Sequence, residues 1–308
     1  MSATELDPAF RTYADKPTAL LTGYTTVRGA ELREIDTMLV EQGGDVPVSG
    51  FETRFGRPKQ GEGGTESLNT DHVDECLRFL QAVDFVEVTP QEVVSRFNGG
   101  AFTELSFEAR LLYHVRQQSG RRRHLTYVSE VLTGLDEPRV SLERLIEEVQ
   151  ADDRESYDLS WNEEKIRMWA NLFDPLGAVS YYNDGDAREI LASPTRSLMS
   201  ELIAHHTAHA PDEGSVVDLF EWIDETFLPV FAKRSGEPWL SIAVADTLRT
   251  MSEDGCLTMY RESDSQTVVR LPQAGGSART ISKLDFESPA ETAAYRYPLD
   301  RTTRRTPQ

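Results

Sequence analysis

Residues 160–191 read SWNEEKIRMWANLFDPLGAVSYYNDGDAREIL, and this stretch decides the fold class. Ser160 and Glu163 have the S-x-x-E spacing of a capping box, which predicts that a helix starts there. Apolar residues at every third or fourth position continue the helix until Gly177, a helix-stopping position. Two short apolar strands then flank the sequence Asn-Asp-Gly-Asp at 183–186, which is typical of a hairpin turn.

The same helix-then-hairpin pattern occurs three times in the chain. The copies are Leu77–Val94, Trp169–Leu191 and Leu248–Leu271. Their helix stops, Asp84, Gly177 and Gly255, recur roughly every 80 to 90 residues. We therefore predict a mainly α protein with short antiparallel β-hairpins, built from three tandem units. In the last unit the strand Leu257–Tyr260 is expected to pair with Thr267–Leu271.

Changes in composition mark the expected boundaries between these units. The N-terminal residues carry few apolar anchors, and the C-terminal ones are rich in Arg, Thr and Pro. We expect a flexible arm at 1–20, units at 21–103, 104–195 and 196–288, and a disordered tail at 289–308.

Capped helices, helix stops and hairpins in this order resemble the winged helix-turn-helix superfamily in tandem, a type frequent in archaeal regulators. The resemblance is architectural, because no family-specific peptide is matched. In DNA-binding members the helix before the hairpin enters the major groove. The resemblance implies groove helices at about 70–83, 161–173 and 239–252. The first two begin with acidic residues, which repel phosphates, and this departs from the family pattern.

The charge balance of the 308 residues is acidic, with 52 Asp and Glu against 32 Lys and Arg and a net charge of −20. Only five of the basic residues are lysines. Such a composition resembles the proteins of halophilic archaea, whose acidic surfaces stay solvated in molar salt. Cys76 and Cys256 stand in apolar surroundings, as expected in a reducing cytoplasm. With no signal peptide and no apolar run of roughly 18 residues, we predict a cytoplasmic protein without membrane contact.

Two windows, residues 109–129 and 265–283, contain basic residues but no acidic ones. Because guanidinium groups bind phosphate oxygens in a bidentate geometry, we predict that these windows contact the backbone of double-stranded DNA. The predicted contacts are Arg116, Arg121, Arg122, Arg123, Arg270, Arg279 and Lys283. The alternative is that these cations form ion pairs with carboxylates elsewhere on the chain.

Candidates for catalysis and metal binding are few. Glu201, His205 and His209 follow one another at four-residue spacing, so one helix face could offer metal ligands, but these residues also continue an apolar stripe at the edge of a core. The triplet 163–165, Glu-Glu-Lys, resembles the E-x-K of nuclease sites but opens a helix instead of lying on a strand. No phosphate-binding glycine loop, dinucleotide fingerprint or nucleophile elbow occurs. We therefore predict no catalysis, no cofactor and no bound metal.

These patterns predict a non-enzymatic DNA-binding protein, either a transcription regulator or an accessory subunit of a DNA-processing or defence assembly. The alternative is a protein–protein assembly module, like the winged-helix kite subunits of chromosome-condensing complexes, which binds a protein partner or forms a homodimer and has no DNA contact. For that alternative, the apolar helix at 220–231 with Trp222 is the expected partner-facing surface. A metal-dependent enzyme is the third hypothesis.

Overall fold

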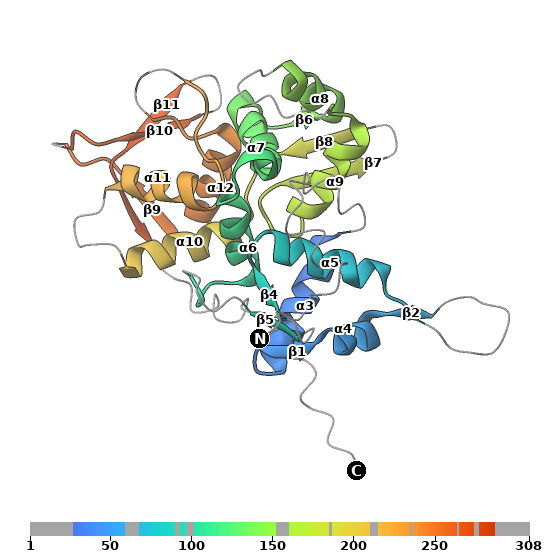
Figure 1. Cartoon of the computed structure of the whole chain (residues 1–308). Helices are drawn as coiled ribbons and strands as arrows, with labels where there is room; N and C mark the ends of the chain where they lie inside the picture. Colours follow the sequence, from blue (N-terminus) through green and yellow to red (C-terminus); the bar gives the residue numbers. More distant parts are fainter. Residues whose placement is uncertain are drawn as a thin grey trace, which may run out of the picture.

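The computed structural model describes most of the chain between the two ends. The described residues are 27–58, 68–89, 93–96, 102–151, 160–184, 187–209, 215–234, 236, 238–263, 265–273 and 277–286. The predicted arm and tail lie outside them. Within them the chain is mainly α-helical with short antiparallel strand pairs, as predicted (Figure 1). In these ranges no helix reaches both the length and the apolarity that a membrane crossing requires.

The first segment, residues 27–96, packs helices against a small three-stranded sheet and also contains a separate two-stranded ladder. Its elements are α3 (Gly29–Glu41), β1 (Asp45–Pro47), α4 (Val48–Phe55), β2 (Arg57–Pro58), β3 (Leu68–Asn69), α5 (Asp71–Ala82), β4 (Val86–Val88) and β5 (Val93–Arg96). The antiparallel sheet has the order β1-β5-β4, with Val94 opposite both Val46 and Val88. The last strand of the hairpin therefore lies in the middle of the sheet.

The second segment, residues 107–191, begins with an additional α-helix and 3-10 helix and then repeats this order without the two-stranded ladder. Its elements are α6 (Phe107–Arg116), the 3-10 helix η1 (Gly120–Arg123), α7 (His124–Leu135), β6 (Val140–Ser141), α8 (Leu142–Ala151), α9 (Glu163–Phe173), β7 (Ser180–Asp184) and β8 (Ala187–Leu191). The sheet has the order β6-β8-β7, and Ile190 of β8 lies opposite both Val140 and Tyr181. In both segments, a helix, a strand, two helices and a hairpin follow one another.

The three predicted helix stops are confirmed by their backbone angles. Asp84, Gly177 and Gly255 have φ values of 59°, 71° and 76°, in the left-handed region that ends helices. Asp tolerates this region better than most residues because its short side chain can hydrogen-bond locally. At Gly177 a Cβ would also lie 2.5 Å from the Thr195 hydroxyl, so only glycine fits.

The residue that caps helix α9 is Asn162 and not Ser160, which the capping box predicted. Helix α9 begins at Glu163, and the side chain of Asn162 accepts a hydrogen bond from the Lys165 amide at 3.0 Å. This later start leaves Trp161 outside the helix, and its ring is buried next to Tyr127. Burial of the indole therefore outweighs the local capping preference.

The hairpin predicted for the last unit is also wrong. The third segment, residues 196–286, contains α10 (Arg196–His209), α11 (Val216–Thr226), α12 (Ile242–Glu253), β9 (Leu257–Tyr260), β10 (Val269–Pro272), β11 (Ala278–Ile281) and β12 (Lys283–Phe286). Strand β9 pairs with β12, and β10 pairs with β11. The other edge of β10 is occupied by residues 238–240, because the Leu240 amide donates to the Arg270 carbonyl at 3.0 Å and the Arg270 amide donates to the Pro238 carbonyl at 2.9 Å. Strand β9 therefore has no free edge of β10 to join.

One continuous apolar core runs through all three segments. Helix α6 lies near its centre and contacts α3, α7, α10 and α11, so it joins the first segment to the second and third (Figure 1). Trp169 of α9 is fully buried, and its indole N–H donates to the Leu125 carbonyl at 2.9 Å. Each sheet is formed within its own segment, whereas the helices supply the packing between segments.

Candidate functional site

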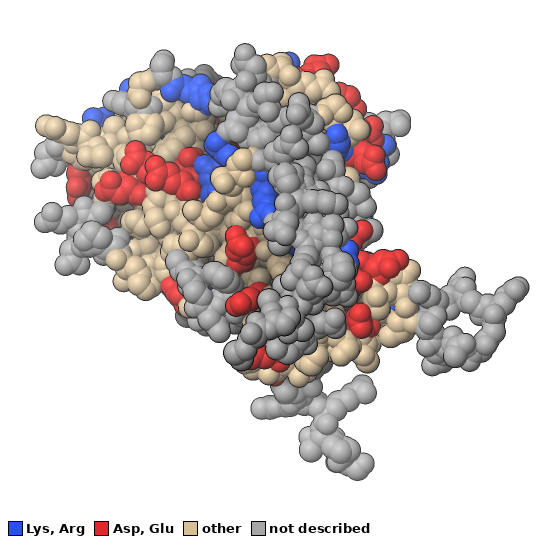
Figure 2. Space-filling view, viewed as in Figure 1, with Lys and Arg blue, Asp and Glu red and all other residues tan. Residues whose placement is uncertain are grey.

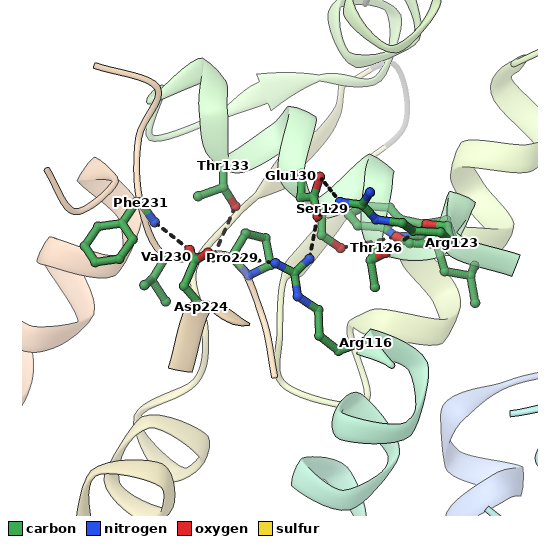
Figure 3. A network of polar contacts seen from close by, with 12 residues as sticks. Arg116, Arg123, Thr126, Ser129, Glu130, Thr133, Asp224, Pro229, Val230 and Phe231 are labelled. Atoms are coloured by element: carbon green, nitrogen blue, oxygen red, sulfur yellow. Dashed lines mark hydrogen bonds and ion pairs between the residues drawn. The ribbon is translucent and has the colours of Figure 1, made fainter. Parts of the chain in front are cut away.

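The first basic window, residues 109–129, meets carboxylates inside the protein. The Arg116 side chain at the end of α6 is only 13% exposed, and its guanidinium lies 2.5 Å from Glu130 and 3.8 Å from Asp224. Arg123 reaches the same Glu130 carboxylate at 3.1 Å (Figure 3). Two of the predicted phosphate contacts are thus held by one glutamate of α7.

Asp224 of α11 completes this network. One of its carboxylate oxygens accepts hydrogen bonds from the amides of Val230 at 2.7 Å and Phe231 at 3.2 Å (Figure 3). Burial raises the pKa of Asp224, whereas these hydrogen bonds and the charge of Arg116 act in the opposite direction. The network therefore ties α6 and α7 to the chain that leaves α11.

The other arginines of this window also make contacts within the protein. Arg110 forms a buried ion pair with Asp36 of α3 at 2.6 Å. Arg122 donates to the Ala82 carbonyl at 2.8 Å. The side chain of Arg121 lies outside the described residues. The ion pairs of Arg110, Arg116 and Arg123 correspond to the alternative in which these cations pair with carboxylates elsewhere on the chain, and a role in DNA binding stays a prediction.

The cations of the second basic window, residues 265–283, do not lie on one common face of the protein. Arg270 lies opposite Thr280, and Arg279 lies opposite Leu271, so the two arginines occupy alternate positions and point to opposite faces of the β10–β11 ladder. The Arg270 guanidinium lies 5.3 Å from the centre of the Trp239 ring. On the other face Arg279 is exposed, and its guanidinium donates to the Met259 carbonyl.

Lys283, the third cation of this window, belongs to the separate β9–β12 ladder. Its ammonium lies 3.6 Å from the Glu262 carboxylate and 5.7 Å from the centre of the Tyr260 ring. A hydrogen bond to Tyr260 and the charges of Tyr260 and Glu262 raise the pKa of Lys283. On the face shown in Figure 2, described basic side chains appear in separate groups beside acidic ones and form no continuous patch.

The helices that were expected to enter a DNA groove have bounds close to the prediction, but they present little cationic surface. Helix α12 buries six of its twelve residues, including Thr247, whose hydroxyl donates to the Pro194 carbonyl at 3.0 Å. Helix α5 also buries six of twelve residues and exposes Asp71 at its start. Helix α9 exposes Glu163 and Glu164 at its start.

A histidine and glutamate cluster forms where the connector, residues 102–106, crosses α10. The Nδ1 atom of His205 lies 3.1 Å from the Glu104 carboxylate, and the His205 and His209 rings are 4.3 Å apart between centroids. Glu201, the third candidate ligand from the sequence, instead accepts hydrogen bonds from the amide and hydroxyl of Ser106, both at 2.6 Å. Sequence spacing identified both histidines but missed Glu104, since nothing local links the connector to α10.

Aromatic rings surround one side of this cluster. His205 stacks on Trp222 at 5.8 Å, and Phe102 contacts both rings edge-on. Burial lowers the pKa of His205, whereas the Glu104 carboxylate acts in the opposite direction. Phe220 and Phe227 are also buried and Trp222 is partly buried, so these rings pack in the core, and the partner-facing surface at 220–231 stays a prediction.

The remaining catalytic candidates have no activating surroundings. Burial raises the pKa of the Cys76 thiol to about 12, which disfavours the reactive thiolate. In the E-x-K triplet, the Lys165 ammonium donates to the Ser160 carbonyl, and Glu163 forms ion pairs with Arg188 and Arg167. These contacts stabilise the start of α9.

Of the sequence-derived candidates, the structure therefore brings together His205 and His209, and it adds Glu104 to them. It separates Glu201 from this cluster and distributes the candidate cations over several surfaces and internal ion pairs. Comparison with protein families, with curated proteins and with solved structures finds no match to this chain.

Proposed function

We propose that this chain is a non-enzymatic assembly module whose winged-helix units bind a protein partner. The order α3-β1-α4-α5-β4-β5 and its repeat α7-β6-α8-α9-β7-β8 support the winged-helix assignment. In both sheets the last strand lies between the other two, as in winged-helix domains. The third segment has its short strand before α12 and a different hairpin pairing, so we assign it as a diverged unit.

The observation that carries this proposal is the lack of a cationic face on the helices before the hairpins. Helices that read DNA expose one face to the bases, and phosphate contacts require cations that are free to bind. Here the uncovered face of α5 begins with Asp71 and Asp74, Arg249 on α12 is paired with Asp246, and α9 exposes two glutamates at its start. The described arginines of residues 109–129 make contacts within the protein. A protein-binding role fits these facts better than groove insertion.

The β7–β8 hairpin is the proposed contact surface. Tyr182 on β7 is 55% exposed, and exposed aromatic side chains are frequent anchors of protein interfaces. It lies opposite Glu189 of β8, and the neighbouring Arg188 forms an ion pair with Glu163 of α9. The Glu189 carboxylate is itself paired with Arg139, so the exposed ring supplies the proposed contact.

Co-purification of the tagged full chain from its native host, with and without nuclease treatment, tests the proposal. The proposal predicts a stoichiometric protein partner that stays bound after nuclease treatment. Recovery of nucleic acid without a protein partner would contradict it.

DNA binding is the second candidate function, and it is favoured by one observation. Arg279 is exposed on the β10–β11 hairpin, which follows the α12–β9 unit near the place where a wing contacts DNA. This hypothesis predicts an electrophoretic shift of double-stranded DNA that weakens in an Arg279→Ala variant. The substitution also removes the hydrogen bond from Arg279 to the Met259 carbonyl, so the thermal unfolding midpoint of the variant is measured alongside.

A further inference from the structure

Three side chains with metal-binding groups converge between the connector and α10. Glu104, His205 and His209 each place a ligand atom within 4.8 Å of the other two. The His205 Nδ1 and Glu104 Oε1 atoms are 3.1 Å apart. Two ligands of a tetrahedral zinc ion, each about 2.0–2.1 Å from the metal, are separated by about 3.3 Å. This pair therefore needs almost no movement to share one ion.

The backbone around Glu104 is held in place by the neighbouring contacts. Glu201 binds the amide and hydroxyl of Ser106, so the connector is fixed to α10 one turn before His205. At the other end of the connector, Phe102 adopts a φ of 70°, which is unfavourable for a bulky residue. Its ring packs against His205 and Trp222, and such strained residues cluster at functional sites.

The orientation of His209 also suits metal binding. Its Nδ1 atom lies 2.9 Å from the His205 carbonyl, and because a carbonyl only accepts hydrogen bonds, Nδ1 carries the proton. The other ring nitrogen, Nε2, then has a free lone pair. Metal-binding histidines usually donate their second N–H group to a carbonyl or carboxylate in this way.

We propose that Glu104, His205 and His209 bind one zinc ion. Two imidazoles and one carboxylate are a common zinc donor set, whereas magnesium and calcium prefer oxygen ligands alone. Three protein ligands leave the fourth tetrahedral position to water. The ion would join the connector to α10 and so link the first two segments to the third. This site is independent of the proposed protein partner.

Calorimetric titration of the metal-stripped full chain with zinc tests the proposal. The titration is done in excess magnesium, because the many surface carboxylates of this acidic chain bind divalent cations weakly. We expect saturation at one zinc per chain. Glu104→Gln and His209→Gln should each weaken zinc binding at least about tenfold. Loss of a residue that only orients a metal ligand already costs about tenfold or more in affinity. Both side chains are exposed, so these variants should fold.

His206→Gln is the matched control, because His206 lies on the same helix but outside the cluster. This variant should keep the affinity of the unmodified chain. Cobalt in place of zinc gives a second measurement, since a tetrahedral site produces an intense visible absorption that His209→Gln should abolish. Absence of one-to-one zinc binding, or unchanged affinity in Glu104→Gln and His209→Gln, would overturn the proposal.

Discussion

Asp36 of α3 and Arg110 of α6 form a buried ion pair that joins the first segment to the second. The guanidinium and carboxylate are 2.6 Å apart, and the Asp36 and Arg110 side chains are 3% and 11% exposed. The Arg110 Nε–H also donates to the Leu105 carbonyl at 3.1 Å. An arginine from the first basic window therefore connects two segments of the core.

We predict that Asp36→Ala lowers the free energy of unfolding by about 3–5 kcal/mol, because it leaves the buried Arg110 charge without its carboxylate. The double variant Asp36→Leu/Arg110→Met should recover most of this loss, since it removes both charges and keeps the volume. Urea denaturation monitored by circular dichroism measures both effects.

The exposed ion pair between Glu41 and Arg54, at 2.8 Å, is the matched control. Glu41→Ala should lower the free energy of unfolding by less than about 1 kcal/mol, because solvent screens this pair. Equal losses for Asp36→Ala and Glu41→Ala would show that burial does not set the strength of the Asp36–Arg110 pair.

The raised pKa of Asp224 predicts that the unmodified chain and Asp224→Asn differ in free energy of unfolding by an amount that depends on pH. The pKa of Asp224 is raised above its ordinary value of 3.8, so the folded protein binds this proton more tightly than the unfolded chain does. The resulting stabilisation is present below pH 3.8 and is lost as the pH rises through the folded-state pKa. Asparagine keeps an oxygen acceptor for the Val230 amide but does not titrate.

The stability of Asp224→Asn relative to the unmodified chain should therefore increase as the pH rises from below 3.8 towards neutrality. Urea denaturation at a series of pH values measures this difference, in which the titration of shared surface groups cancels. A constant difference at every pH would contradict the raised pKa.

Tyr182→Ala should reduce recovery of the protein partner without changing the thermal unfolding midpoint. The ring is 55% exposed, so its removal affects an interface more than the core. Val40→Ala is the matched control, because Val40 is equally exposed on α3 in the first segment. If both variants retain the partner equally, the β7–β8 hairpin is not the contact surface.

High salt should raise the thermal unfolding midpoint of this chain. With a net charge of −20, the folded state carries strong self-repulsion at low ionic strength. At 1 M salt the Debye length is about 3 Å, which screens most of this repulsion. Calorimetric scans in increasing KCl measure the midpoint, and a midpoint that stays constant or falls would speak against the halophilic interpretation of the acidic surface.

Local chemistry predicted much of the fold. The stops at Asp84, Gly177 and Gly255 could be read from the sequence, because a left-handed residue after an amphipathic helix has a strong local signature. The pairing of β9 with β12 could not be read from the sequence. Both β9 and β10 bury apolar residues, so the pattern also allows β9 to pair with β10. The choice depends on residues 238–240, which bind the other edge of β10.

The candidate site was predicted only in part, and for a similar reason. His205 and His209 share a helix face, which the four-residue spacing shows directly. Glu104 joins them only because the tertiary fold brings the connector to α10. The ion pair of Arg110 depends likewise on Asp36, which lies 74 residues away in the chain. A window without acidic residues thus says nothing about the carboxylates that fold against it.

The central claim is that this chain binds protein and not DNA, and that the described arginines of residues 109–129 serve its own structure. Fluorescence anisotropy of a labelled DNA duplex, titrated with the full chain from low to molar KCl, tests it most directly. The account predicts no saturable binding at any salt concentration. Binding that weakens steeply with salt, with a slope reduced in Arg279→Ala, would contradict it, because such a slope counts the phosphates that the protein neutralises.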